Sequence, residues 1–179
     1  MDKQARSKRI RTMVAGAILG AIVTAGFFFV IGVLLLRDSV PPLTEADYRA
    51  ALERWETKGP KNYNCDVEVY GNRPGIVHVE VRSGHVTRMT RDGVEPRQRR
   101  TWDYWTIDGQ LETIGEELEM VNDPQHAFGG GGTAPPILNA KFHPVLGYPE
   151  VYRRSVPGMQ QDMAWKITRF EAADPPARQ

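Results

Sequence analysis

The residue best suited to nucleophilic chemistry is Cys65, the only cysteine in the chain. Nucleophilic catalysis needs an accessible thiol with a base within hydrogen-bonding reach. Cys65 lies in a strand-like run of alternating residues and shares one face with Tyr63 and Val67. We expect that face to be buried, where a thiol is inert, so no catalytic residue is assigned.

Histidines are the next candidates, because a metal site needs three or four convergent ligands. The chain has His78, His85, His126 and His143. With Ser83-Gly84 as a two-residue turn, His78 is expected to face Met89 and to lie about 10 Å along the hairpin from His85. His126 falls in an expected loop and His143 precedes a proline, so no metal ligand and no cofactor are assigned.

Carboxylates and glycines offer no clear chemistry either. Glu112, Glu116 and Glu119 recur at helical spacing, which is typical of a solvated helix face. The four glycines at 129–132 are not followed by the Gly-Lys-Ser/Thr of a phosphate-binding loop, so a flexible insertion is expected.

Arginines and aromatic residues form a pattern that is typical of binding. The run contains Arg88, Arg91, Arg97, Arg99 and Arg100, followed by Trp102, Tyr104 and Trp105. Arginine and tryptophan are frequent anchors at protein interfaces. We predict partner contacts at Arg97, Arg99, Trp102 and Trp105. A solvated loop whose aromatic side chains fold into the core is the alternative.

Small residues suggest a second contact near the N-terminus. Gly16 and Gly20 make a GxxxG match, and Ala21 and Ala25 continue the small-residue pattern. Such residues let membrane helices approach closely, so Gly16 and Gly20 are predicted partner contacts. The segment contains no histidine, so it is not expected to ligate a haem or chlorophyll metal.

These glycines lie in an apolar segment, residues 12–36, which has no charged residue, histidine or proline. At about 1.5 Å rise per residue this helix would be about 37 Å long, enough to cross a ~30 Å hydrocarbon core. A cleaved signal peptide is the rival interpretation, but its apolar core is shorter and ends at a small-x-small site. We predict an uncleaved signal anchor and a single transmembrane helix over 12–36.

The basic residues predict the orientation of this helix. Five precede it, at Lys3, Arg6, Lys8, Arg9 and Arg11, and only Arg37 directly follows it. Basic flanks stay in the cytoplasm, so residues 1–11 are expected on the cytoplasmic side of a bacterial inner membrane. The rest of the chain is then periplasmic or extracellular. No internal disulfide can form there with a single cysteine.

The remaining residues predict one α+β domain. A stiff linker over 37–43 contains Pro41 and Pro42. Thr44-Glu45-Ala46-Asp47 resembles a capping box, and Gly59-Pro60 ends the helix that it begins. The expected elements after it are strands near 63–69, 77–82 and 86–91, a helix over 107–120, and strands over 137–143, 150–156 and 161–171.

Hairpin-linked strands favour antiparallel pairing, so we expect a two-layer domain over 44–171 with both helices on one face of the sheet. The order is helix, three strands, helix, three strands, followed by a flexible tail over 172–179. Apolar and charged fractions of 41% and 25% are ordinary for a globular protein, and a net charge of +1 gives no sign of nucleic-acid binding.

Four stretches of the domain together resemble a known family. They are Arg54-Trp55-Glu56, Tyr63, residues 79–86, and residues 142–149 with their Gly147-Tyr148-Pro149 turn. The set resembles a bacterial family of exported domains known as domain of unknown function 6174. The resemblance implies an exported or membrane-attached domain and carries no activity with it.

These patterns predict a membrane-anchored, non-catalytic binding or scaffold protein, and specifically an accessory subunit of a larger membrane complex. Respiratory and photosynthetic complexes are examples of such hosts, and the sequence selects neither. The expected partners are the lipid bilayer and a membrane protein, with no nucleic acid and no small-molecule substrate. Two alternatives stay open: a cell-envelope enzyme with a site built from loops, and a ligand-sensing or inhibitor-like module.

Overall fold

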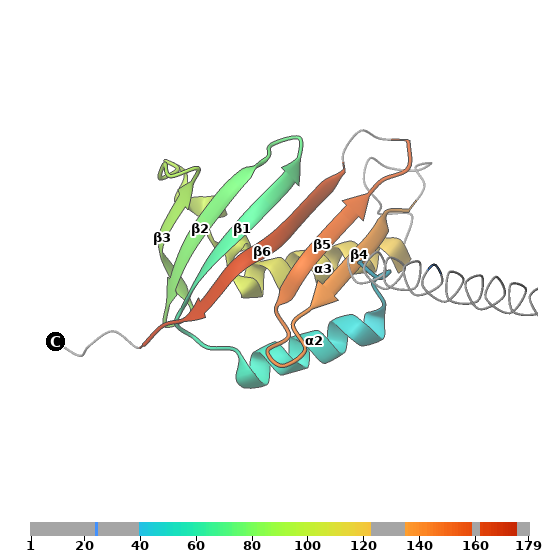
Figure 1. The fold of residues 1–179 in the computed structure, drawn as a ribbon, viewed down its shortest axis with the longest axis horizontal. Coiled ribbons are helices and arrows are strands. Elements are labelled where there is room, and N and C mark those ends of the chain that lie inside the picture. Colours follow the sequence, from blue (N-terminus) through green and yellow to red (C-terminus); the bar gives the residue numbers. More distant parts are fainter. Residues whose placement is uncertain (1–23, 25–39, 123–134, 159–161, 175–179) are drawn as a thin grey trace, which may run out of the picture. The chain divides into compact units, whose positions relative to one another are not determined.

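The computed structural model describes residue 24 and residues 40–122, 135–158 and 162–174 (Figure 1). The elements in this part of the chain are α2 (Glu45–Lys58), β1 (Tyr63–Gly71), β2 (Gly75–Arg82), β3 (His85–Arg91), the short 3₁₀ helices η1 (Arg99–Thr101) and η2 (Asp103–Trp105), α3 (Ile107–Asn122), β4 (Ile137–Phe142), β5 (Pro149–Ser155) and β6 (Met163–Ala172). The predicted α+β domain is confirmed, with the predicted order of helices and strands.

Several predicted features lie outside the described residues. They are the basic segment 1–11, the apolar segment 12–36 apart from Thr24, the glycine-rich stretch 129–132, and the tail beyond residue 174. Gly16 and Gly20 belong to this group. Within the described ranges, no helix combines the length and the hydropathy that a membrane crossing needs.

All six strands belong to one antiparallel sheet with the order β3-β2-β1-β6-β5-β4. The first three strands step outward from the centre of the sheet, whereas the last three step inward from the opposite edge (Figure 1). The two halves therefore share their order of elements but not their direction across the sheet. The first and last strands meet at the centre, so β1 and β6 join the two halves of the domain.

The core lies between one face of this sheet and the two helices. Alternate strand residues point into it, as the buried side chains of Tyr63, Cys65 and Val67 show. From α2 and α3 it receives Trp55, Ile107, Leu111, Ile114 and Leu118, all in one hydrophobic cluster with the strand residues. A period of two in the strands and of about 3.6 in the helices gives each element one apolar face, and burying these faces together forms the two layers.

Helix α2 begins as its sequence predicts. The Thr44 hydroxyl accepts a hydrogen bond from the Asp47 N–H at 3.1 Å and donates one to the Asp47 carboxylate at 2.6 Å. Asp47 stands where a capping box usually has Glu, and its shorter side chain bonds the Thr44 hydroxyl. Close packing of the chain against α2 also explains Gly147, the first residue of the Gly147-Tyr148-Pro149 turn. Gly147 has φ +82°, and a Cβ there would lie 2.1 Å from the Ala51 carbonyl oxygen, so a larger residue is excluded.

The second half of the predicted linker is part of the domain. Leu43 N–H donates to the Leu138 carbonyl, Ala140 N–H donates to the Pro41 carbonyl, and Pro42 makes a bridge to Asn139. Residues 40–43 therefore add to the outer edge of β4, which leaves only residues 37–39 of the predicted linker outside the described domain. Covering an edge strand in this way also blocks pairing with other chains.

One predicted register is wrong. Arg82 pairs with His85 around the Ser83-Gly84 turn as expected, but a bulge between Glu80 and Val81 shifts the pairs that follow. His78 consequently faces Thr90, and Met89 faces Val79 in the core. Period-two counting misses a bulge, because one extra residue moves every later side chain to the other face.

Candidate functional site

The predicted arginine and aromatic contacts do not form one surface. Arg97 and Arg99 are exposed, and the Arg99 guanidinium lies 4.9 Å from the Trp102 ring centroid. Trp102 itself is 4% exposed and belongs to the core cluster. Its indole is therefore covered in this conformation, as the core alternative expects, and it offers no ring to a partner.

Trp105 differs from Trp102, because it is only half-buried and forms part of the walls of two neighbouring pockets. The first, here called the tryptophan pocket, has a volume of about 380 Å³. Its walls are Thr101, Tyr104, Trp105, Gln110, Thr113, Glu116, Met163 and Trp165. This volume falls in the range typical of ligand-binding pockets.

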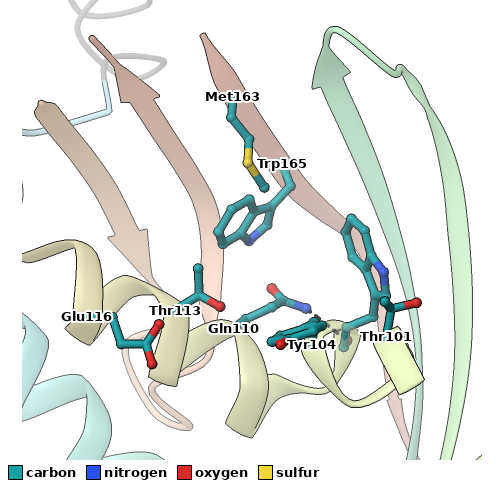
Figure 2. Close-up of a pocket in the computed structure, with 8 residues that line it drawn as sticks. Thr101, Tyr104, Gln110, Thr113, Glu116, Met163 and Trp165 are labelled. Carbon is teal, nitrogen blue, oxygen red and sulfur yellow. Dashed lines mark hydrogen bonds between the residues drawn. The ribbon is translucent and has the colours of Figure 1, made fainter. Parts of the chain in front are cut away.

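Two parts of the chain that are distant in sequence build the tryptophan pocket: β6, and the adjacent elements η2 and α3. Met163 and Trp165 reach down from β6, Gln110 and Thr113 rise from α3, and Tyr104 comes from η2 (Figure 2). The chain turns sharply between η2 and α3, where a Cβ on Gly109 would lie 2.1 Å from the Asp103 carbonyl oxygen. Gly109 therefore allows η2 to lie close to the first turn of α3 and to bring its aromatic residues to the pocket.

Two polar groups in this pocket are buried without a partner in the described part of the chain. Gln110 donates through Nε2 to the Trp105 carbonyl at 3.1 Å, but its Oε1 accepts no hydrogen bond there. The indole N–H of Trp165 likewise finds no acceptor. Gln110 and Trp165 are each 2% exposed. Buried polar groups usually have partners, so an unpaired acceptor and an unpaired donor in one pocket make this pocket the candidate binding site.

The second pocket, here called the arginine pocket, has a volume of about 280 Å³. Its walls are Val69, Tyr70, Asn72, Arg73, Arg91, Trp105, Arg154, Asp162 and Met163. Three arginines and one aspartate give it a formal excess of positive charge. Trp105 and Met163 belong to both pockets, so the two sites are direct neighbours.

The buried carboxylate of Glu117 bonds Arg154 and Tyr152, and these two residues connect it to the walls of both pockets. It accepts a hydrogen bond from Arg154 at 2.7 Å, and Arg154 lines the arginine pocket. It also accepts a short hydrogen bond from the Tyr152 hydroxyl. The Tyr152 ring packs 4.4 Å from Trp165, which lines the tryptophan pocket. Burial, followed by the charge of Glu117, raises the pKa of Tyr152, so its hydroxyl stays a donor to Glu117.

The predicted site residues do not include Gln110 and Glu117, although the sequence carries a signal for both. Helix α3 has an apolar stripe at Ile107, Leu111 and Ile114, and Gln110 and Glu117 lie on that stripe seven residues apart. Both are buried, whereas Glu116 beside them is exposed. A polar residue on an apolar stripe indicates a buried polar contact, and this signal was available from spacing alone.

The candidate nucleophile Cys65 is buried in the core, and the candidate metal ligands His78 and His143 contact other side chains. Cys65 is buried, and burial raises the pKa of its thiol to about 12, so it is not a nucleophile at neutral pH. His78 pairs with Asp66 at 2.5 Å on the sheet face away from the helices, and His143 stacks on Tyr148 at 4.7 Å. In the described ranges, no group of three or more His, Cys, Asp or Glu residues could hold a metal ion.

Comparison with protein-family models, curated proteins and solved structures finds no match to this chain. The resemblance to family 6174 therefore stays a prediction.

Proposed function

We propose that this protein is a membrane-anchored, non-catalytic binding protein, and that the tryptophan and arginine pockets form its contact surface. The observation that carries the proposal is the position of Trp105 in the walls of both pockets. Tryptophan and arginine supply much of the binding energy at protein interfaces, and both gather here around unpaired polar groups. The sequence of residues 12–36 supports an anchor, and a short tether keeps the domain close to its partner in the membrane.

The most specific form of this proposal is an accessory subunit of a membrane complex at the bacterial inner membrane. Two contacts would then act together: the pockets on the domain, and Gly16 with Gly20 in the predicted transmembrane helix. Close packing through two small residues depends on the helix backbones approaching each other, and larger side chains prevent that approach.

Native gels of membranes solubilised in mild detergent test this proposal. Trp105→Ala should lower the fraction of the protein that migrates in its largest complex, whereas the total amount in the membrane should stay normal. Val145→Ala is a matched control, because Val145 is exposed and lies outside both pockets. Full retention of Trp105→Ala in the complex would place the contact elsewhere, and migration of the unmodified protein as a monomer would reject the subunit proposal.

A double variant, Gly16→Leu with Gly20→Leu, tests the helix contact separately. Leucine is more apolar than glycine, so membrane insertion should persist. Loss from the complex at a normal membrane level supports helix packing. Full retention would leave the domain as the sole contact.

A ligand-sensing module is the second candidate, and the tryptophan pocket favours it. A volume of about 380 Å³ with an unpaired donor and an unpaired acceptor suits a small polar–apolar molecule. Native mass spectrometry of the purified full chain distinguishes this candidate, since a sensor should retain a small molecule that Gln110→Leu releases.

A further inference from the structure

The unpaired groups in the tryptophan pocket have complementary hydrogen-bonding roles. Gln110 offers an acceptor, Oε1, and Trp165 offers a donor, its indole N–H. Figure 2 shows the Trp165 ring pointing from β6 toward Gln110 on α3, so the two residues lie on facing walls of the pocket. An amide carries one N–H donor and one C=O acceptor, which is the complement of this pair.

Large apolar side chains also line this pocket. Tyr104 and Met163 line the pocket together with the two tryptophan rings. An occupant that places an amide between Gln110 and Trp165 would therefore also bury an apolar group against these rings. A peptide bond next to a bulky apolar side chain meets both requirements.

The neighbouring arginine pocket adds a requirement for negative charge. Arg91 donates to the Arg73 backbone carbonyl, and neither guanidinium makes an ion pair with a carboxylate among the described residues. Glu117 fixes Arg154 in the same wall. Guanidinium groups bind carboxylates through charge-assisted, bidentate hydrogen bonds. Asp162 in this wall offsets only part of the positive charge.

We propose that the paired pockets bind an extended acidic peptide segment of the partner protein. A bulky apolar residue sits in the tryptophan pocket with its backbone amide between Gln110 and Trp165. An Asp or Glu one or two positions away places its carboxylate at Arg73 and Arg91, because an extended chain advances about 3.3 Å per residue and the pockets share a wall. This inference rests on the proposed function and adds the chemistry of the partner.

Peptide display tests the inference directly. The full chain, biotin-tagged and reconstituted in lipid nanodiscs, is used to select from a random library of twelve-residue peptides. Selected peptides should carry a bulky apolar residue one or two positions from an Asp or Glu. Absence of enrichment over empty nanodiscs, or enrichment of peptides without an acidic residue, would overturn the inference.

Variants of the protein then test each pocket with one selected peptide, measured by fluorescence anisotropy. The double variant Arg73→Ala with Arg91→Ala should weaken binding roughly tenfold or more, yet bind the Asp→Asn form of the peptide as the unmodified protein does. Gln110→Leu should weaken both forms of the peptide equally, because it removes the amide acceptor and leaves the arginines. Arg49→Ala, an exposed arginine on α2, is the matched control and should bind normally.

The affinities for the Asp and Asn peptides decide whether the bound segment must be acidic. Equal affinity of the unmodified protein for the Asp and Asn peptides would remove the carboxylate from the proposal and overturn it. Thermal melting of each variant excludes loss of folding as the cause of weaker binding. Loss of Trp105→Ala from the native complex with no peptide selected would keep the proposed function and reject only the acidic segment.

Discussion

The polar side chains on the two faces of the sheet differ in burial and in pairing. On the face away from the helices, His78 bonds Asp66, and Glu80 lies within 3.6 Å of His78 and 3.5 Å of Arg88. These side chains are partly exposed and satisfy one another. On the helix-covered face the polar groups are fewer and buried, and Gln110 and Trp165 each keep one unpaired atom at a pocket.

The two faces therefore differ in what their polar groups indicate about binding. Charged residues on a solvated face exchange partners with water at little cost, so their clustering says little about binding. A polar atom that is buried without a partner costs free energy, and an occupant that pairs with it recovers that free energy. The helix-covered face therefore carries the candidate site, although the other face carries more titratable residues.

The largest expected effect comes from the core of the helix-covered face. Trp55→Ala should lower the free energy of unfolding by about 3–5 kcal/mol, because it empties a buried site. It also removes the 3.0 Å hydrogen bond from the indole N–H to Asp108 and edge-on contacts with Tyr63 and Phe170. Chemical denaturation of the purified variant measures the loss, and unchanged stability would show that Trp55 is not part of the core.

A comparable loss is expected at Glu117. Glu117→Ala leaves Arg154 and the Tyr152 hydroxyl without their buried acceptor, and breaking such a pair typically costs about 3–5 kcal/mol. Glu116→Ala on the same helix is the matched control. Because Glu116 is exposed, its removal should change stability by about 0.5 kcal/mol or less. Equal effects from the two variants would contradict the supporting role of Glu117.

Alkaline pH should also destabilise the domain, through titratable groups buried on the helix-covered face of the sheet. Burial raises the pKa of Cys65 from 9.0 to about 12, and burial raises the pKa of Tyr63 and Tyr152 above their ordinary value of 10.0. The native state then holds these protons more tightly than the unfolded state, so stability falls as the pH rises above about 9.

The Cys65→Ala variant separates the thiol from the two tyrosines. It should move the start of this decline from about pH 9 to about pH 10, because only the tyrosines remain. Melting temperatures measured between pH 7 and pH 11 follow the decline. A melting temperature that stays constant over this range would contradict the burial of these groups.

The smallest effect is expected on the solvated face. His78→Ala removes a pair whose side chains are 32% and 24% exposed, and exposed pairs contribute about 0–1 kcal/mol. Stability should change by less than about 1 kcal/mol, and retention in the native complex should not change. A loss of cellular function by this variant at normal abundance would move the candidate site to the other face and revive the enzyme alternative.

Local sequence patterns predicted the order of α2, α3 and the six strands, and their bounds to within two residues. Alternation of apolar residues marks the strands, Thr44 marks the start of α2, and Gly59-Pro60 marks its end, since these signals act through neighbours a few residues apart. The same local signals placed Cys65 in the core. Residues 12–36 are likewise predicted by local composition, and they stay a prediction.

The strand order, the bulge beside Glu80 and the candidate site depend on contacts between elements that are far apart in the sequence. Trp105 was predicted as a contact from its type, but its neighbours in the pockets come from β6 and α3, up to 60 residues away in the sequence. Trp102, three residues earlier, has the same side chain and is buried. Local pattern specifies which face of an element is apolar, whereas burial and hydrogen-bond satisfaction depend on which elements meet. The packing of β6 against α3 leaves Gln110 Oε1 and the Trp165 indole N–H unpaired among the described residues, and these two atoms mark the candidate binding site.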